Sequence, residues 1–154
     1  MSKAKSTEIR FYHLQKQTLD QALPLILEKA YTTKKNVVVR LSDEKEVTRM
    51  NGHLWSYKTD SFMPHGCKKE GNADKQPIWL TDKDENPNGA KIIILTGGAQ
   101  SKHINDYDLC CEILDGRSNE QVTEARKRWK TYKEQDFNIT YWMQSDSGGW
   151  EQKA

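Results

Sequence analysis

The sequence contains little cysteine, and the positions of its cysteines exclude several classes of small protein. Three cysteines occur among 154 residues, and two of them are adjacent at Cys110 and Cys111. This arrangement provides neither the paired framework of a disulfide-stabilised secreted domain nor the Cys-x-x-Cys spacing of common zinc sites. We therefore expect reduced, buried thiols in a cytosolic protein.

Long hydrophobic runs are also missing. Residues 1–7 are polar and do not contain the apolar core of a secretory signal peptide. No apolar run approaches the length of about 20 residues that a membrane-spanning helix requires. Apolar residues make up 35% of the chain and charged residues 30%, a balance typical of a soluble globular protein. The expected location is the cytoplasm.

The chain has no large excess of charge of one sign, but its charges are unevenly distributed. The formal net charge is +2. Between residues 117 and 133, six basic residues stand against two acidic ones, which gives +4 locally and leaves −2 on the rest of the chain. A general nucleic-acid binder usually carries a larger and more widely spread positive charge.

Apolar runs and helical periodicities alternate along the chain, as in folds with a central parallel sheet. The sequence predicts an α/β fold: one three-layer α/β/α domain over residues 1–154, with a mainly parallel sheet, a flexible tail at 1–7 and a C-terminal hairpin. Ligands of such folds often bind beyond the C-terminal ends of the strands. Strands are predicted at 8–14, 36–41, 77–80, 91–96, 109–114 and 137–143, and helices from Thr18 to about 34, from Ser42 to about 55, and from Ser118 or Asn119 to about 135.

The motifs of nucleotide and metal chemistry are missing or incomplete. Gly97 and Gly98 follow a predicted strand, but the glycine and lysine spacing of a phosphate-binding loop does not occur, and a tight turn is the better interpretation. The segment 82–89 begins like a calcium loop, but Pro87 and Ile93 occupy the positions that need glycine and glutamate. The histidines are scattered, and Cys67 near His65 lies on a predicted loop, where catalytic pairs are rare. We expect no metal, no cofactor and no catalytic activity.

The segment Glu124-Ala-Arg-Lys-Arg-Trp-Lys-Thr-Tyr-Lys133 is the most informative part of the chain. At about 100° per residue, Val122, Ala125, Trp129 and Tyr132 share one helix face, and Arg126, Lys130 and Lys133 form a stripe beside it. Trp129 lies at the border between the two. Such a border suits an acidic partner with an aromatic end, although an ordinary amphipathic helix with a solvated basic side has the same pattern.

Several short motifs follow one another along the chain: Leu54-Trp55, Ser61-Phe-x-Pro-His65, Glu124-Ala-Arg-x-Arg-Trp-Lys-x-Tyr132, Phe137-Asn138 and Tyr141-Trp142. In this order they resemble the chi subunit family of bacterial DNA polymerase III. The similarity extends from Glu8 to Trp142, and the C-terminal helix is its most specific part.

The resemblance implies a non-catalytic accessory subunit of the clamp-loader assembly, with a nucleotide-binding-like fold that has no phosphate loop. It also implies two partners: the acidic C-terminal tail of single-stranded DNA-binding protein (SSB), which ends in proline and phenylalanine, and the psi subunit. By motif position, Arg126 would hold the terminal carboxylate and Trp129 would form the pocket wall. Lys130 and Lys133 would attract the acidic residues of the tail.

A second interface is expected in the long aperiodic segment 56–76, because long loops often carry function. Its candidate residues are Trp55, Phe62, Met63, Pro64 and His65. A loop that Phe62 folds onto the sheet is an equally good interpretation. Two other functions remain open: direct binding of single-stranded nucleic acid, in which Trp129 and Tyr132 stack on bases, and a degenerate nucleotide-binding enzyme.

Overall fold

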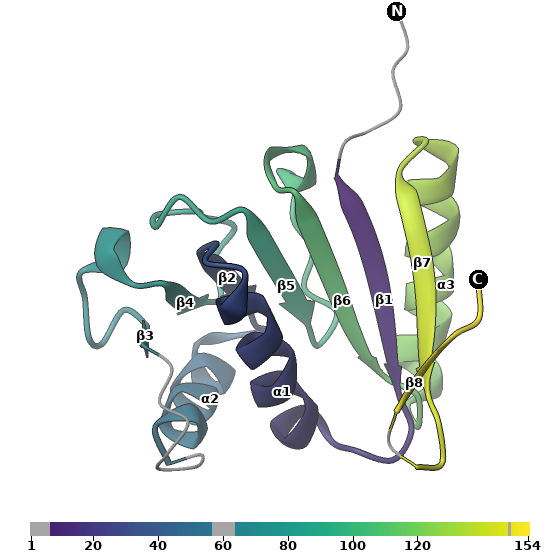
Figure 1. Cartoon of the computed structure of the whole chain (residues 1–154), viewed down its shortest axis with the longest axis horizontal. Helices are drawn as coiled ribbons and strands as arrows, with labels where there is room; N and C mark the ends of the chain where they lie inside the picture. Colours follow the sequence, from purple (N-terminus) through teal and green to yellow (C-terminus); the bar gives the residue numbers. More distant parts are fainter. Residues whose placement is uncertain (1–6, 57–63, 148) are drawn as a thin grey trace, which may run out of the picture.

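The alternating segments fold into one twisted sheet, shown in Figure 1. The computed structural model describes residues 7–56, 64–147 and 149–154. Strand order is β3-β4-β2-β5-β6-β1-β7-β8, and every pair is parallel except β7 with β8. The strands are β1 (Glu8–Leu14), β2 (Val37–Arg40), β3 (His65–Gly66), β4 (Ile78–Thr81), β5 (Ile92–Thr96), β6 (Leu109–Asp115), β7 (Asn138–Gln144) and β8 (Trp150–Gln152).

Helices cover both faces of the sheet. The connections through α1 (Leu19–Thr32) and α2 (Glu44–Ser56) lead toward the β3 edge, whereas the connection from β6 to β7 through α3 (Asn119–Glu134) leads toward the β8 edge. Because such crossovers are right-handed, connections of opposite direction place their helices on opposite faces. In Figure 1, α1 and α2 lie in front of the sheet and α3 lies behind it. The predicted α/β/α arrangement with a mainly parallel sheet is confirmed.

Two hydrophobic clusters fill the spaces between the layers. Side chains of successive strand residues point to opposite faces, so Val37 and Val39 join the cluster under α1 and α2, while Val38 joins the cluster under α3. In β1, Phe11 points toward α3, and Leu14 belongs to the cluster on the α1 side. The apolar run at 36–41 is therefore buried on both faces, as the sequence predicts.

Polar side chains cap the helices at their N-termini. Thr18 and Gln21 form a reciprocal capping box at α1, which continues past Pro24. At α3 the Ser118 hydroxyl accepts a hydrogen bond from the backbone N–H of Gln121. The expected start of α2 at Ser42 is wrong by two residues.

The side chain of Asp43 accounts for the later start of α2. Asp43 Oδ1 accepts a hydrogen bond from the Glu46 backbone N–H at 2.8 Å, and the helix begins at Glu44. The preceding residue Ser42 is exposed and lies outside the helix. Both aspartate and serine are strong capping residues, so composition alone does not choose between them.

The ends of the chain and the long loop add four short features. The predicted hairpin is confirmed, because β8 pairs antiparallel with β7. Within the predicted loop 56–76, His65–Gly66 forms β3 and Ala73–Lys75 forms a 3-10 turn. Thr7, at the end of the predicted tail, is buried, and its hydroxyl donates to the Tyr107 carbonyl at 2.6 Å. Among the described residues, no helix has the length and apolarity needed to cross a membrane.

Gly116 lies where the chain leaving β6 passes beside the end of β1. Its backbone N–H donates to the Leu14 carbonyl at 2.8 Å, and an added Cβ would overlap both that carbonyl oxygen and Nε2 of His13. We expect Gly116→Ala to lower the free energy of unfolding by roughly 2–3 kcal/mol, measured by urea denaturation. Gly52→Ala is the control: nothing lies within 4 Å of its Cβ position in α2. The control should gain about 0.5–1 kcal/mol, and equal effects would contradict the clash.

Candidate peptide-binding site

Helix α3 packs against the sheet through the face that its periodicity predicts. Ala125 and Tyr132 are buried, and Val122 and Trp129 are partly buried against the same cluster. The four residues follow the helical repeat, so their side chains line one side of the helix. The interior of the protein therefore fixes α3 in position, and its opposite side is left for solvent or a partner.

Trp129 is held by aromatic neighbours and still has accessible surface. Its ring makes edge-to-face contacts with Phe11 and with Tyr141, each at 5.7 Å between centroids. Phe11 and Tyr141 are themselves stacked at 5.8 Å, so the three rings form one cluster from α3, β1 and β7. Trp129 is intermediate in exposure, whereas Phe11 is fully buried. A fixed, partly exposed indole of this kind is a suitable wall for an apolar ligand group.

Arg126 lies one turn before Trp129 and has no acidic partner among the described residues. Its side chain is exposed, and its positive charge acts on Tyr141, which contacts Trp129, and on His13, which contacts Tyr141. Burial lowers the pKa of His13, and the charge of Arg126 lowers it further. Burial raises the pKa of Tyr141, and Arg126 opposes that shift. His13 Nδ1 and the Tyr141 hydroxyl are hydrogen-bonded at 2.7 Å. Because the charge of Arg126 acts on both groups, its guanidinium lies close to the ring cluster.

The other basic residues of α3 differ in their partners. Lys130 and Lys133 are exposed and make no ion pair within the described chain. Lys127, by contrast, pairs with Glu124 at 3.3 Å. Lys130 follows Arg126 by four residues, so both side chains lie on the same stripe. The structure thus brings Arg126, Trp129 and Lys130 together on one surface, with Lys133 one turn further along.

A buried ion pair anchors α3 to the sheet, and the sequence analysis did not assign it. Arg128 Nε donates to Glu112 Oε1 at 2.6 Å, and the two side chains are 12% and 2% exposed. Burial raises the pKa of Glu112, while Arg128 and the Tyr132 hydroxyl oppose that shift. A glutamate inside the apolar strand sequence Leu-Cys-Cys-Glu-Ile-Leu is the signal that points to such a partner, because a buried carboxylate needs one.

The residues of the predicted second interface are only partly brought together. Trp55, at the end of α2, is 47% exposed and contacts the ring of His65 at 4.4 Å between centroids. His65 is buried, and Pro64 is half-buried. Phe62 and Met63 lie outside the described residues. Trp55 is therefore the member of this group with the most accessible apolar surface among those that the structure describes.

A cavity of about 520 Å³ lies at the C-terminal ends of the strands, between the loops after β1 and β6. Nucleotides bind at this position in many folds of this class. Two arginines line it, but both are engaged with carboxylates. Arg49 binds Asp20 at 2.7 Å and Glu46 at 2.9 Å, and Arg117 binds Asp115 at 2.9 Å. Cations that are neutralised in this way offer little to a phosphate, which agrees with the missing phosphate loop.

Asp84 of the calcium-like segment and the thiol of Cys67 are both engaged in hydrogen bonds within the protein. Asp84, in the calcium-like segment, accepts hydrogen bonds from the Ser101 hydroxyl at 2.6 Å and from the Lys102 backbone N–H at 2.9 Å. Cys67 Sγ donates to Glu70 at 3.2 Å, and burial raises the pKa of the thiol, which disfavours the nucleophilic thiolate. Within the part of the chain that the structure describes, no cluster of three or more His, Cys, Asp or Glu side chains has the geometry of a metal site.

The buried pair predicts a pH-dependent defect. Arg128→Ala leaves the Glu112 carboxyl buried without its cation and should lower the free energy of unfolding by roughly 3–5 kcal/mol at neutral pH. The pKa of Glu112, already raised by burial, should rise further in this variant. The folded state then retains a proton that the unfolded state releases above its carboxyl pKa of about 4.3, so stability falls as pH rises from there. Urea denaturation at several pH values measures the effect.

The matched control for this pH series is the double variant Arg128→Ala with Glu112→Gln. It has no titrating carboxyl at this position, so its free energy of unfolding should lose the pH dependence assigned to Glu112. A defect in Arg128→Ala that stays constant from acidic to neutral pH would contradict the assignment.

Comparison with known proteins identifies the family. The model of the family described as "DNA polymerase III chi subunit, HolC" matches residues 6–140. The "Probable DNA polymerase III subunit chi" of Rickettsia prowazekii (strain Madrid E) is 31% identical over 88 residues, which cover 57% of this chain and 53%, about half, of that relative. The "DNA polymerase III subunit chi" of Escherichia coli (strain K12) is 23% identical over 123 residues, which cover 79% of this chain and 82% of the relative. The chain belongs to the DNA polymerase III chi subunit family.

Proposed function

We propose that this chain is a non-catalytic accessory subunit in DNA replication, which binds the acidic C-terminal tail of SSB and links it to the clamp loader of DNA polymerase III in the cytoplasm. Family membership supports a place in the polymerase assembly. The surface of α3 supports the ligand. In this role the protein contributes binding surfaces, and its residues need no cofactor.

The observation that carries the proposal is Arg126, which has no ion pair among the described residues, one turn before the partly exposed ring of Trp129. A guanidinium can bind a carboxylate through two parallel hydrogen bonds, and Arg126 is not engaged by any acidic group among the described residues. A ligand that presents a carboxylate and an aromatic ring on the same residue matches this pair. The C-terminal phenylalanine of the SSB tail has both groups.

Two neighbouring lysines support a preference for an acidic tail. Lys130 and Lys133 extend the positive surface along α3, where they can attract aspartates that precede the phenylalanine. These exposed charges are screened by salt, so the affinity should fall as ionic strength rises. Burial of one phenylalanine with a few charge-assisted bonds gives about 5–7 kcal/mol, or dissociation constants of roughly 10–200 μM.

A second surface around Trp55 is proposed to contact psi or another component of the polymerase assembly. Trp55 is among the few large apolar side chains that are exposed in the described structure, and it lies on the outer side of α2. Exposed tryptophans are enriched at protein interfaces because they bury a large area at low entropic cost. This surface belongs to a different face from α3, so both partners can bind at once.

Titration with synthetic SSB tail peptides tests the ligand. We expect saturable binding of the complete peptide by calorimetry and a loss of at least tenfold when the terminal phenylalanine is removed, because the ring is lost and the new terminal carboxylate, on proline, is no longer attached to an aromatic residue. Equal binding of both peptides would contradict the pocket. Tight binding of oligonucleotides of any sequence, with a steep salt dependence, would instead favour direct nucleic-acid binding.

Substitution of Arg126 separates ligand binding from folding. Arg126→Ala should weaken the complete peptide at least tenfold while it changes the free energy of unfolding by less than about 0.5 kcal/mol, because the side chain is exposed. Lys127→Ala is the control: it removes the same charge from the next position, where the lysine pairs with Glu124. Similar losses of affinity in both variants would show that only the general charge of α3 matters.

A further inference from the structure

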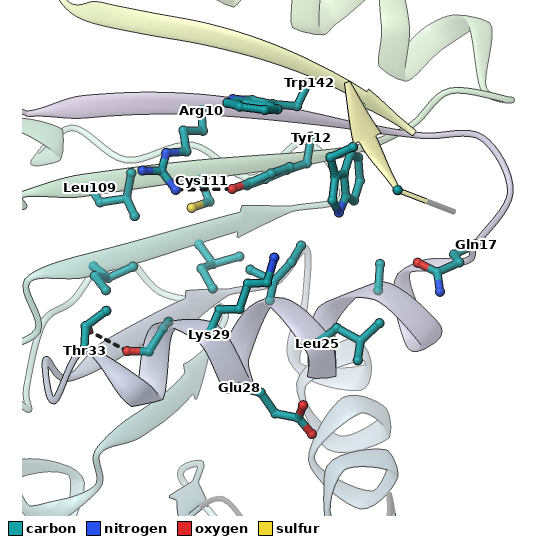
Figure 2. A pocket seen from close by; sticks show the side chains of 17 residues that line it. Arg10, Tyr12, Gln17, Leu25, Glu28, Lys29, Thr33, Leu109, Cys111 and Trp142 are labelled. Atoms are coloured by element: carbon teal, nitrogen blue, oxygen red, sulfur yellow. Dashed lines mark hydrogen bonds between the residues drawn. The ribbon is translucent and has the colours of Figure 1, made fainter. Parts of the chain in front are cut away.

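A wide apolar groove lies on the face of the sheet opposite to α3. It has a volume of about 790 Å³ and runs between α1 and the hairpin of β7 and β8 (Figure 2). Ile94, Leu109 and Cys111 contribute to its floor, and Trp142 and Trp150 line it on the hairpin side. The groove shares no residue with the proposed SSB-tail site.

The connections between the strands explain why this groove is open. The crossover through α1 leaves β1 toward β2, so α1 packs over the β2 and β5 side of the front face. The crossover from β6 to β7 takes α3 to the back. No described helix therefore covers the front of β6, β1 and β7, as Figure 1 shows. A position that a three-layer fold normally fills with a helix is vacant within the described chain.

The side of α1 that faces the groove has the spacing of a helix-packing surface. Ala22, Ile26, Lys29 and Thr33 line the groove and are separated by four, three and four residues. This spacing places their side chains in one row, the arrangement that packs against a neighbouring helix. The row is about 16 Å long, which corresponds to three turns of a helix beside it. On its other flank α1 contacts α2, where Arg49 binds Asp20.

The charged side chains of the groove indicate which charge a partner should carry. Figure 2 shows Lys29 extending from α1 toward the strands and Arg10 facing it from β1. Glu28 also lines the groove, but its side chain extends away from the strands. Arg10 pairs with Glu8 at 2.6 Å, but Lys29 has no ion pair among the described residues. Leu25, next to this row, is 40% exposed. The part of the groove next to the strands thus combines apolar area with one cation, Lys29, that has no ion pair among the described residues.

We propose that this groove is a third docking surface, which binds an amphipathic α-helix of another DNA polymerase III subunit, with an acidic side chain of that helix paired to Lys29. The proposal rests on family membership in the polymerase assembly but not on the SSB-tail site. The partner helix lies alongside α1 and covers Trp142 and Trp150, which completes the front helical layer. Its row of apolar residues faces Leu25 and Ile26.

Binding to each purified subunit of the polymerase, one at a time, tests the surface. One subunit should protect the backbone amides of residues 22–33 from hydrogen exchange, and Leu25→Asp should weaken that complex at least tenfold. Tyr31→Asp is the matched control, because Tyr31 is on the same helix and is 39% exposed but does not line the groove. The control should keep its affinity within about twofold.

Charge reversal tests the electrostatic part of the proposal. Lys29→Glu should weaken the same complex at least tenfold, whereas Lys45→Glu, which changes the net charge equally at an exposed position of α2, should not. An acidic-to-lysine change in the partner helix should restore binding to Lys29→Glu. Restoration identifies the pairing, since a general loss of fold or charge would not be reversed by the partner.

Three results would overturn the proposal. No subunit protects residues 22–33; or Leu25→Asp and Tyr31→Asp have the same effect; or Leu25→Asp abolishes self-association of the chain, measured by sedimentation, without affecting any subunit. The last result would assign the groove to a second copy. Titration of Leu25→Asp with the SSB tail peptide distinguishes the groove proposal from the SSB-tail proposal. This variant should bind the peptide with unchanged affinity, because Leu25 is not part of the tail site.

Discussion

The buried contact between Glu112 and Arg128 fixes the helix on which the proposed binding site depends. It joins β6 to α3 at 2.6 Å in a region from which water is largely excluded. Arg128 is used for this internal contact, and Arg126, two residues earlier, points about 160° away around the helix. One arginine therefore positions the helix while the other stays available for a ligand, and neither can replace the other.

The handedness of the crossovers separates the surfaces of the molecule. Because the connection after β6 runs opposite to those after β1 and β2, α3 lies on the back, and within the described residues the front helical layer stops beside α1. The back face carries the charged aromatic border at Trp129. The front face keeps an apolar groove beside Lys29. Such a separation lets one small domain contact several partners without competition between them.

The features predictable from the sequence depend on local patterns. The run Val37–Arg40 and the repeat through Ala125 and Tyr132 were identified correctly because burial on two faces or on one helix side leaves a periodic signal. The pairing of Glu112 with Arg128, sixteen residues apart, was missed because it depends on where α3 crosses the sheet. The groove was missed for a similar reason: its walls come from α1 and from the far end of the chain.

The central claim is that Arg126 binds the terminal carboxylate of the SSB tail, and a double-mutant cycle measures this contact directly. The dissociation constants of four complexes are needed: wild type and Arg126→Ala, each with the natural tail peptide and with the same peptide amidated at its C-terminus. A direct charge-assisted pair predicts a coupling energy above about 1 kcal/mol, since either change alone removes the same contact. Additive losses, with coupling near zero, would show that Arg126 and the carboxylate do not meet.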